Sequence, residues 1–351
     1  MNRRLWLTTL LAIFLHACFS PLNGTSLPAS TPTETVVPTI PIATLTPTPP
    51  PPAPQTPEPT QISAPPQPIS RVLIVTFDGL RPDAIQAAEM TNVLSLMQNG
   101  AYTLTAQTIM PSTTLPAHTS LVTGTCPAKH IVRWNEYVPD NGYALGTDIF
   151  DLTHAVGLRT VLITGKEKLR HVTESGSTDF FGFVDNTDEE KDIATLDNIV
   201  VEQIREGFGL MLVHFPDGDV VGHEYGWMSK QQLSAYRKND RSFGTFLNVL
   251  KDSGLYEGTL IIITADHGGA LTDPPHGTNI PEAMTIPWII SGPQVVPGVL
   301  QTPVYIMDTA ATVAFALGLP IQPNWDGAPV YEAFGLPVDP LQQRGCAGTT
   351  P

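Results

Sequence analysis

Apolar runs that alternate with amphipathic stretches are the main structural signal along this chain. Beyond residue 70, short runs rich in Val, Ile and Leu predict buried strands at 72–77, 160–164, 210–215 and 259–265. Stretches with the helical spacing of apolar residues lie between them, at 148–156, 188–204 and 230–251. Strands that are apolar on both faces and alternate with helices are typical of a mainly parallel sheet covered by helices on both sides. We therefore expect one α/β domain over about residues 71–340, followed by a short tail at 341–351.

The first 18 residues follow a different pattern. Arg3 and Arg4 precede an apolar run, Leu5–Leu15, which is too short to span a bilayer comfortably and has the layout of a secretory signal. The Leu-His-Ala-Cys sequence that ends at Cys18 resembles the lipobox of bacterial lipoproteins, in which the cysteine is lipidated. A plain signal peptide cut nearby is the alternative. We expect residues 1–18 to be a lipoprotein-type signal, and the protein to be exported and held on the extracytoplasmic side of a membrane by lipid at Cys18.

Export changes the interpretation of the segments that follow. Residues 19–70 are dominated by Pro, Thr, Ala and Ser, and such a composition predicts a disordered, extended linker because it offers few apolar groups to bury. The linker would hold the folded domain away from the membrane.

Cys126 and Cys346 are the other cysteines of the chain, and in an oxidising compartment they are able to form a disulfide. Their positions in the sequence do not decide whether they pair.

Composition narrows the range of partners. Apolar residues make up 42% of the 351 residues, which is enough for a sizeable core. There are 33 acidic and 18 basic residues, and the net charge of −15 argues against nucleic acid as a stable partner and against direct binding to an anionic membrane surface. Divalent cations bound by carboxylates fit this balance better, although a requirement for solubility accounts for the acidic charge equally well.

Acidic and imidazole side chains gather where the predicted strands end. One strand runs into Asp78, the third into a segment with Asp217, Asp219 and His223, and the fourth into Asp266 and His267. The carboxyl ends of parallel strands meet at one edge of a sheet, so these side chains should converge. So many carboxylates in one crevice would repel one another unless cations lay among them. A mixed carboxylate and imidazole set suits zinc or a similar divalent ion, and His276 in the nearby sequence PPHGTN is a further candidate ligand.

The motifs occur in an order that resembles a known family. The order is Asp78, STTLPAHTSLVTG (112–124), Asn135, DVVGHEYG (219–226), TADHGG (264–269) and HGT (276–278). It resembles the alkaline phosphatase superfamily, and within it the type I phosphodiesterase/nucleotide pyrophosphatase branch. The resemblance extends from about residue 72 to 330 and implies an alkaline phosphatase-like fold and a metal-dependent hydrolase of small phosphoric esters.

The resemblance also implies a role for each motif. The nucleophile would be Thr114, two residues before a proline, and Asn135 would help to bind the phosphoryl oxygens. Two divalent ions, most simply zinc, would bind between the motifs. The resemblance implies one ion held by Asp219, His223 and His276, and a second held by Asp78, Asp266, His267 and the Thr114 oxygen. Asp217 fits the family spacing less well than Asp219 does. A metal-bound threonine hydroxyl loses its proton more readily than a free one, so the chemistry agrees with this assignment.

The type of ester is left open. Lys166 and Lys168 follow the second predicted strand and resemble basic residues that contact the phosphoryl group in monoesterases and phosphonate hydrolases of the superfamily. The loop and metal motifs instead favour a diesterase acting through a phospho-threonine. Sulfatase activity as the main role is disfavoured, since Thr114 and His118 stand where sulfatases need Cys or Ser and Arg. An inactive surface module that only binds phosphate is the alternative from another functional class.

Overall fold

The computed structural model describes residues 69–185, 189–339 and 345–346. The predicted signal at 1–18 and the predicted linker at 19–70, apart from its last two residues, lie outside this part of the chain. The tail at 341–351 lies outside it as well, except for residues 345 and 346.

The domain is built on an eight-stranded sheet whose strands follow the order β4-β3-β5-β1-β6-β7-β2-β8. All neighbouring strands are parallel except that β7 runs antiparallel to both β6 and β2. The strands are β1 (Arg71–Phe77), β2 (Ala101–Gln107), β3 (Thr160–Thr164), β4 (Phe180–Phe183), β5 (Leu210–Phe215), β6 (Thr259–Thr264), β7 (Thr285–Ser291) and β8 (Gly298–Val299). The central strands are buried along their length, apart from Arg71 at the start of β1, because helices cover both faces of the sheet.

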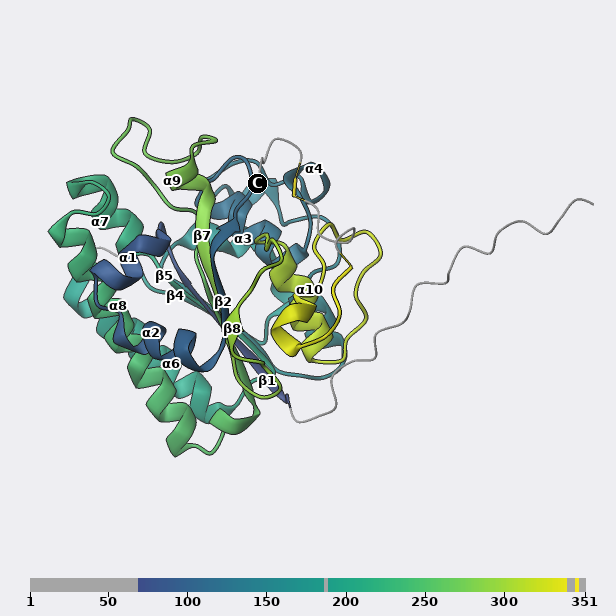
Figure 1. Cartoon of the computed structure of the whole chain (residues 1–351). Helices are drawn as coiled ribbons and strands as arrows, with labels where there is room; N and C mark the ends of the chain where they lie inside the picture. The colour runs from purple at the N-terminus through teal and green to yellow at the C-terminus, as the bar shows by residue number, and fades with distance from the viewer. Residues whose placement is uncertain (1–68, 186–188, 340–344, 347–351) are drawn as a thin grey trace, which may run out of the picture. The chain divides into compact units, whose positions relative to one another are not determined.

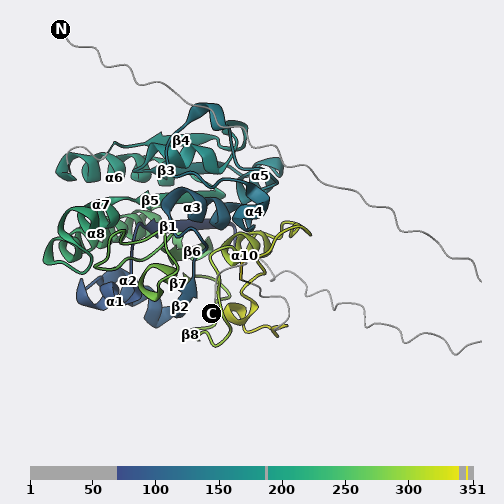
Figure 2. The same cartoon turned by 90° about the horizontal axis from the view of Figure 1, so that it is seen from above.

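The helices form two layers (Figures 1 and 2). One layer contains α1 (Pro82–Ala87), α2 (Thr91–Asn99), α6 (Glu189–Glu206), α7 (Asp217–Tyr225) and α8 (Lys230–Asp252). The opposite layer contains α3 (Thr114–Thr123), α4 (Pro127–His130), α5 (Ile149–Ala155) and α10 (Asp308–Ala316), and the short α9 (Pro281–Met284) leads into β7. Short 3₁₀ turns connect these elements: η1 (Pro139–Asn141), η2 (Glu167–Val172), η3 (Ser175–Ser177), η4 (Tyr256–Gly258) and η5 (Tyr331–Phe334).

The predicted α/β architecture with a mainly parallel sheet and helices on both faces is confirmed. The four predicted strands are β1, β3, β5 and β6, of which β6 ends one residue earlier than expected, at Thr264. The three predicted helices are α5, α6 and α8. A capping box starts α5, because the Asp148 carboxylate accepts from the backbone of Phe150 and Asp151 while the Asp151 carboxylate accepts from the Asp148 N–H.

The register of the central strands brings their carboxyl ends level with one another. Phe77 at the end of β1 pairs with Phe215 at the end of β5, and Thr76 pairs with Thr264 at the end of β6. The residues that follow these three ends therefore emerge side by side at one edge of the sheet. The nucleophile candidate reaches this edge from the opposite layer, at the start of the fully buried helix α3.

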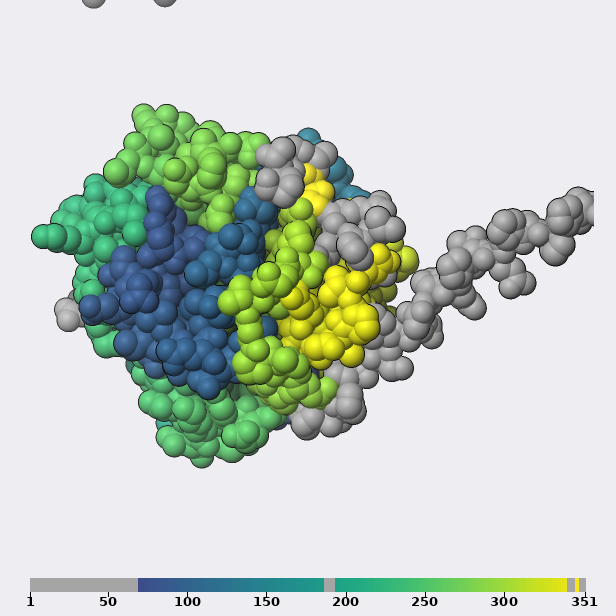
Figure 3. Space-filling model, in the orientation of Figure 1, coloured from purple at the N-terminus to yellow at the C-terminus, as the bar shows by residue number. Residues whose placement is uncertain are grey.

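A disulfide joins Cys126 to Cys346, which answers the pairing question that the sequence left open. Cys126 directly precedes α4, so the bond ties the C-terminal end of the described chain to the segment after the α3 helix. In the space-filling view, lime-to-yellow residues of the last third lie directly against the blue residues of the first third (Figure 3). Among the described residues, no helix is both long and apolar enough to cross a membrane.

Candidate active site

The three strand ends bring together a buried group of acidic and imidazole side chains. Asp78 follows β1, Asp266 and His267 follow β6, and all three are fully buried. The His267 Nε2 lies 3.4 Å from Asp78 Oδ1, 3.4 Å from Asp266 Oδ2 and 3.9 Å from Asp219 Oδ1. Ligand atoms of Asp78, Asp219 and His267 all lie within 4.8 Å of one another, as needed to hold one ion; we name these three residues the inner group.

Asp219 also belongs to a second cluster, nearer the surface. It lies in the first turn of α7, and His223 lies one helical turn further along the same helix. The Asp219 Oδ1 is 3.4 Å from His223 Nε2 and 3.4 Å from His276 Nε2, and the two imidazole nitrogens are 2.9 Å apart. We name Asp219, His223 and His276 the outer group; its ligand atoms also lie within 4.8 Å of one another.

The candidate ligands expected from the sequence therefore converge, with one difference in how they are grouped. The sequence assigned Asp266 to the inner set, whereas the compact inner group contains Asp219, which both groups share, with Asp266 beside it. Asp217 lies in neither group. It is buried at the start of α7, where its Oδ2 accepts a hydrogen bond of 2.7 Å from Asn239.

Several buried polar atoms of the site lack the hydrogen bonds that burial normally requires. Within the described part of the chain no hydrogen-bond partner is found for Asp78 Oδ1, Asp219 Oδ1, Asp266 Oδ2 and His267 Nε2. A buried polar atom without a partner carries a large desolvation cost, so such atoms are rare in proteins. All four are oxygen or imidazole nitrogen atoms that face one another, which is the donor set zinc prefers. The residues present thus fit divalent cations.

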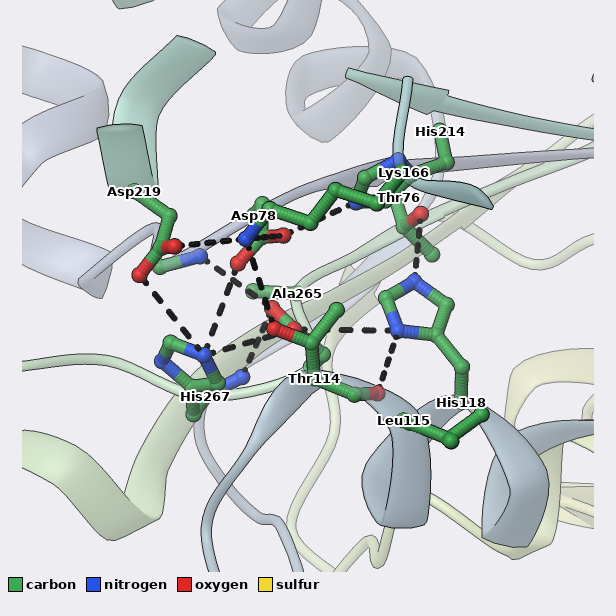
Figure 4. A network of polar contacts seen from close by, with 12 residues as sticks. Thr76, Asp78, Thr114, Leu115, His118, Lys166, His214, Asp219, Ala265 and His267 are labelled. Atoms are coloured by element: carbon green, nitrogen blue, oxygen red, sulfur yellow. Dashed lines mark hydrogen bonds and ion pairs between the residues drawn. The ribbon is translucent and has the colours of Figure 1, made fainter. Parts of the chain in front are cut away.

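Lys166 adds the positive charge within the site. It follows β3, and its ammonium lies 2.7 Å from Asp78 Oδ2, 2.5 Å from Asp219 Oδ2 and 3.4 Å from Thr114 Oγ1. Figure 4 shows the side chain extending above Asp78 toward Asp219. The resemblance implied that Lys166 contacts a phosphoryl group, which stays a prediction. The structure shows that Lys166 links two of the candidate metal ligands.

Thr114 and Asn135 meet at the start of α3. Thr114 is only 1% exposed, and its hydroxyl oxygen lies 3.4 Å from the Lys166 ammonium. The Asn135 Oδ1 accepts a 2.9 Å hydrogen bond from the backbone N–H of Leu115, the residue after Thr114. Since Oδ1 is used in this way, the amide hydrogens of Asn135 are the part of the side chain that remains to donate to a ligand.

Burial and neighbouring charges set the protonation of the site. Burial alone would raise the pKa of Asp78, but the Lys166 ammonium and the His214 hydrogen bond outweigh it and hold that pKa below its usual range. Burial alone would lower the pKa of Lys166, but the carboxylates of Asp219 and Asp78 reverse the direction, so the ammonium stays charged. Burial lowers the pKa of His267, so this imidazole is neutral and able to act as a ligand.

Two buried histidines behind the site were not given a role in it from the sequence, where His118 served only to disfavour a sulfatase. His118 lies in α3 and His214 in β5, and their rings pack edge to face with centroids 5.0 Å apart. Burial lowers the pKa of His118 to about 3 and also lowers the pKa of His214, so both rings are neutral. For His214 the available signal in the sequence was a polar residue inside the otherwise apolar strand LMLVHF. Such a residue is by itself more typical of a hydrogen-bonded histidine in the core than of a functional one.

Comparison with known proteins agrees with this geometry. A profile of the type I phosphodiesterase / nucleotide pyrophosphatase family matches residues 72–151 and 154–282, which include every residue of both groups. The chain belongs to this family. Members of the family depend on metal ions, and the inner and outer groups are where this member could hold them.

Individual relatives are distant. The chain is 27% identical over 284 residues to the catalytic subunit of human GPI ethanolamine phosphate transferase 2, an alignment that covers 76% of the chain and 28% of that protein. It is 26% identical over 240 residues to ectonucleotide pyrophosphatase/phosphodiesterase family member 7 of Mus musculus, covering 58% of the chain and 51% of that protein. The chain thus spans about half or less of the length of these curated relatives.

A solved structure supports the fold. Murine ectonucleotide pyrophosphatase/phosphodiesterase 5 superposes with a TM-score of 0.62 at 15% sequence identity, covering 76% of this chain and 99% of that one. At this level of identity the similarity concerns the fold alone, and it confirms the alkaline phosphatase-like arrangement expected from the motifs.

Proposed function

We propose that the protein is a metal-dependent hydrolase of small phosphoric esters that acts through a phospho-threonine at Thr114. The observation that carries the proposal is the position of the Thr114 hydroxyl, which is buried beside both an ammonium and a cluster of metal-type ligands. A hydroxyl that only capped a helix would need neither neighbour. Family membership supports the same reaction class.

Each residue has a distinct part in this reaction. The Thr114 oxygen forms a bond to phosphorus, the bond from phosphorus to the leaving oxygen breaks, and the alcohol departs. Water then cleaves the phospho-threonine, which releases phosphate or its monoester and restores the hydroxyl. The Asn135 amide and the Lys166 ammonium donate to phosphoryl oxygens as charge shifts, a contribution of about 2.7–4 kcal/mol for a well-placed donor.

We propose two zinc ions as the resident metals, one in the outer group and one in the inner group with Asp266 beside it. Divalent ions at these positions would lower the pKa of a hydroxyl or water and neutralise charge on the phosphoryl group. The protein's own contribution is to bring the ligands together at one sheet edge and to exclude water from the inner group, whose side chains are buried.

The assay is hydrolysis of p-nitrophenyl phosphate and bis-p-nitrophenyl phosphate by wild type, Thr114→Ala and Thr114→Ser. We expect Thr114→Ala to lose several orders of magnitude in turnover and still bind zinc, because the Asp and His ligands remain. Thr114→Ser keeps an oxygen at the same place and should retain part of the activity. Near-normal turnover of Thr114→Ala would refute the covalent mechanism. A wild-type protein that binds phosphate but hydrolyses neither ester would support the inactive binding module instead.

A monoesterase or phosphonate hydrolase is the second candidate, and Lys168 favours it. Within the described chain we find no hydrogen bond or ion pair for its half-buried ammonium, and burial together with the charge of Lys166 lowers its pKa. A doubly charged monoester would gain more from a second cation than a singly charged diester would. Lys168→Met should therefore reduce kcat/KM for the monoester far more than for the diester. Equal losses would favour the diesterase.

We further propose that the enzyme works outside the cytoplasm, attached to a membrane through lipid at Cys18. The disulfide between Cys126 and Cys346 supports an oxidising compartment. Cys18→Ala should move the protein from the membrane fraction to the soluble fraction. Unchanged membrane retention would contradict the lipid anchor and leave the hydrolase unaffected.

A further inference from the structure

His214 is a fully buried imidazole whose hydrogen bonds connect the backbone amide directly after β3 to a candidate metal ligand. It lies in β5 beside two other strands, level with Thr76 of β1 and Thr164 of β3. Its Nε2 is 2.9 Å from Asp78 Oδ2, and its Nδ1 is 3.3 Å from the backbone nitrogen of Gly165. Figure 4 shows the ring behind Asp78, on the side away from His267.

The backbone settles which ring nitrogen carries the proton. The Gly165 amide can only donate, so the His214 Nδ1 accepts and carries no proton, which places the ring's N–H on Nε2. The Nε2–H therefore donates to Asp78 Oδ2. A Cβ at residue 165 would lie 2.2 Å from the ring of Pro216, so glycine is what lets this end of β3 approach β5 closely enough for the contact.

The same contact distinguishes the two oxygens of Asp78. Oδ2 receives a hydrogen bond from His214 and forms an ion pair of 2.7 Å with the Lys166 ammonium. Oδ1 has no hydrogen-bond partner within the described residues and faces His267 Nε2 at 3.4 Å. With Oδ2 held from behind, the carboxylate cannot rotate freely, and Oδ1 is the atom presented to the inner group. Hydrogen-bonded partners of this kind commonly orient the ligands of protein metal sites.

The second buried histidine holds the ring of His214 in place. His118 packs against it edge to face. The Nδ1 of His118 donates to the Thr114 carbonyl at 2.9 Å, because that oxygen can only accept, and its Nε2 accepts from the Thr76 hydroxyl at 2.9 Å. The two rings thus join the start of the nucleophile helix to the strand end that carries Asp78.

We propose that His214 is a positioning residue that sets the metal affinity of the inner group through its Nε2–H···Oδ2 hydrogen bond to Asp78. It touches neither substrate nor metal and acts only through the carboxylate. This inference rests on the metal centre of the proposed function, but it does not depend on the phospho-threonine step or on the ester hydrolysed.

The test compares two substitutions of His214 that differ in the hydrogen bond alone. Glutamine carries an amide N–H at about the reach of the imidazole Nε2, and leucine fills similar space without a donor. Zinc affinity of the metal-stripped full chain is measured by titration calorimetry, and the melting temperature of the metal-free protein is recorded in parallel. His154→Leu is the control, since this exposed imidazole pairs with Asp179, outside both groups.

We expect His214→Leu to weaken zinc binding at one site by roughly 10–100-fold, and His214→Gln to remain within roughly 3-fold of wild type. The control should bind as wild type does. If the His214→Leu protein does not fold, His214→Asn serves instead. Asparagine keeps a polar group at this position, but its shorter side chain cannot reach Asp78.

Three results would overturn the inference. Wild-type affinity in the leucine or asparagine variant would show that the hydrogen bond does not matter. A loss of zinc affinity in His214→Gln equal to the loss in His214→Leu would show that only the shape of the ring matters. A wild-type protein that binds no zinc would refute the metal centre itself. A different outcome would separate the two proposals: if His214→Leu loses zinc affinity while Thr114→Ala keeps normal turnover, the phospho-threonine is refuted and the role of His214 stands.

Discussion

Removal of the Lys166 ammonium should destabilise the metal-free protein much more than the zinc-loaded one. In the metal-free site this ammonium lies 2.7 Å from Asp78 and 2.5 Å from Asp219, both of which are buried. In Lys166→Met the buried carboxylates lose their only contacting ammonium among the described residues. Breaking a buried pair in this way costs about 3–5 kcal/mol.

Proton uptake limits this cost. A carboxyl of ordinary pKa ~3.9 can be neutralised at pH 7 for about 4 kcal/mol, which is close to the loss expected from the broken pair. For a domain of this size each kcal/mol corresponds to roughly 2 °C, so the melting temperature of Lys166→Met in a chelator should fall by about 8 °C. With excess zinc, bound cations compensate the same carboxylates, and the fall should be about 2 °C or less.

Differential scanning calorimetry at pH 7, with EDTA and then with zinc, measures both values. Lys168→Met is the matched control: it removes an ammonium from the same loop, and no ion pair of this side chain is found within the described chain. Its melting temperature should change by less than about 2 °C in either condition. If the melting temperature of Lys166→Met falls by the same amount with and without zinc, the reasoning is refuted. It is also refuted if the melting temperature does not fall in EDTA.

Three further predictions concern the rest of the domain. Replacing Cys126 and Cys346 by serine removes a cross-link over 220 residues, worth up to about 5 kcal/mol; an unchanged melting temperature would contradict this. In Gly269→Ala the new Cβ would lie 2.2 Å from Trp227, so denaturant unfolding should show a loss of about 1–3 kcal/mol. Burial raises the folded-state pKa of Asp308 to about 7, so its stabilising contribution is complete below pH ~3.9 and lost as the pH rises through 7. Urea unfolding at pH 5 and pH 8 should therefore differ less in Asp308→Asn than in wild type.

The sequence predicted the centre of the fold better than its edges. Continuous apolar runs marked β1, β3, β5 and β6 because these strands are buried on both faces. The strand β2, with sequence AYTLTAQ, mixes buried residues with partly or fully exposed ones and contains two threonines, so its apolar signal is weak. The strand β7 has Pro287 in its interior, which argues against a strand from sequence alone. Its antiparallel direction depends on pairing with β6 and β2, which no local pattern encodes.

The convergence of the candidate ligands could be expected from the sequence, because several of them follow strand ends that the register of the sheet makes level. The sequence could not show that Asp219 belongs to both groups, because this depends on how α7 packs against the end of β6. Nor could it show the contact of Lys166 with two carboxylates, which depends on the direction of a flexible side chain. The role of His214 was also out of reach, since it depends on which backbone amide meets the other nitrogen of the ring.

The unequal burial of the two groups has a consequence for metal exchange. Asp78 and His267 are fully buried, while the side chain of His223 in the outer group is 48% exposed. An ion in the outer group can leave by losing one solvent-facing ligand first, whereas an ion in the inner group can leave only if the surrounding packing opens. We therefore expect the outer ion to equilibrate quickly with the medium and the inner ion to remain for the lifetime of the fold. On that basis an enzyme that holds the two zinc ions proposed above would respond to the surrounding zinc concentration through its outer group alone.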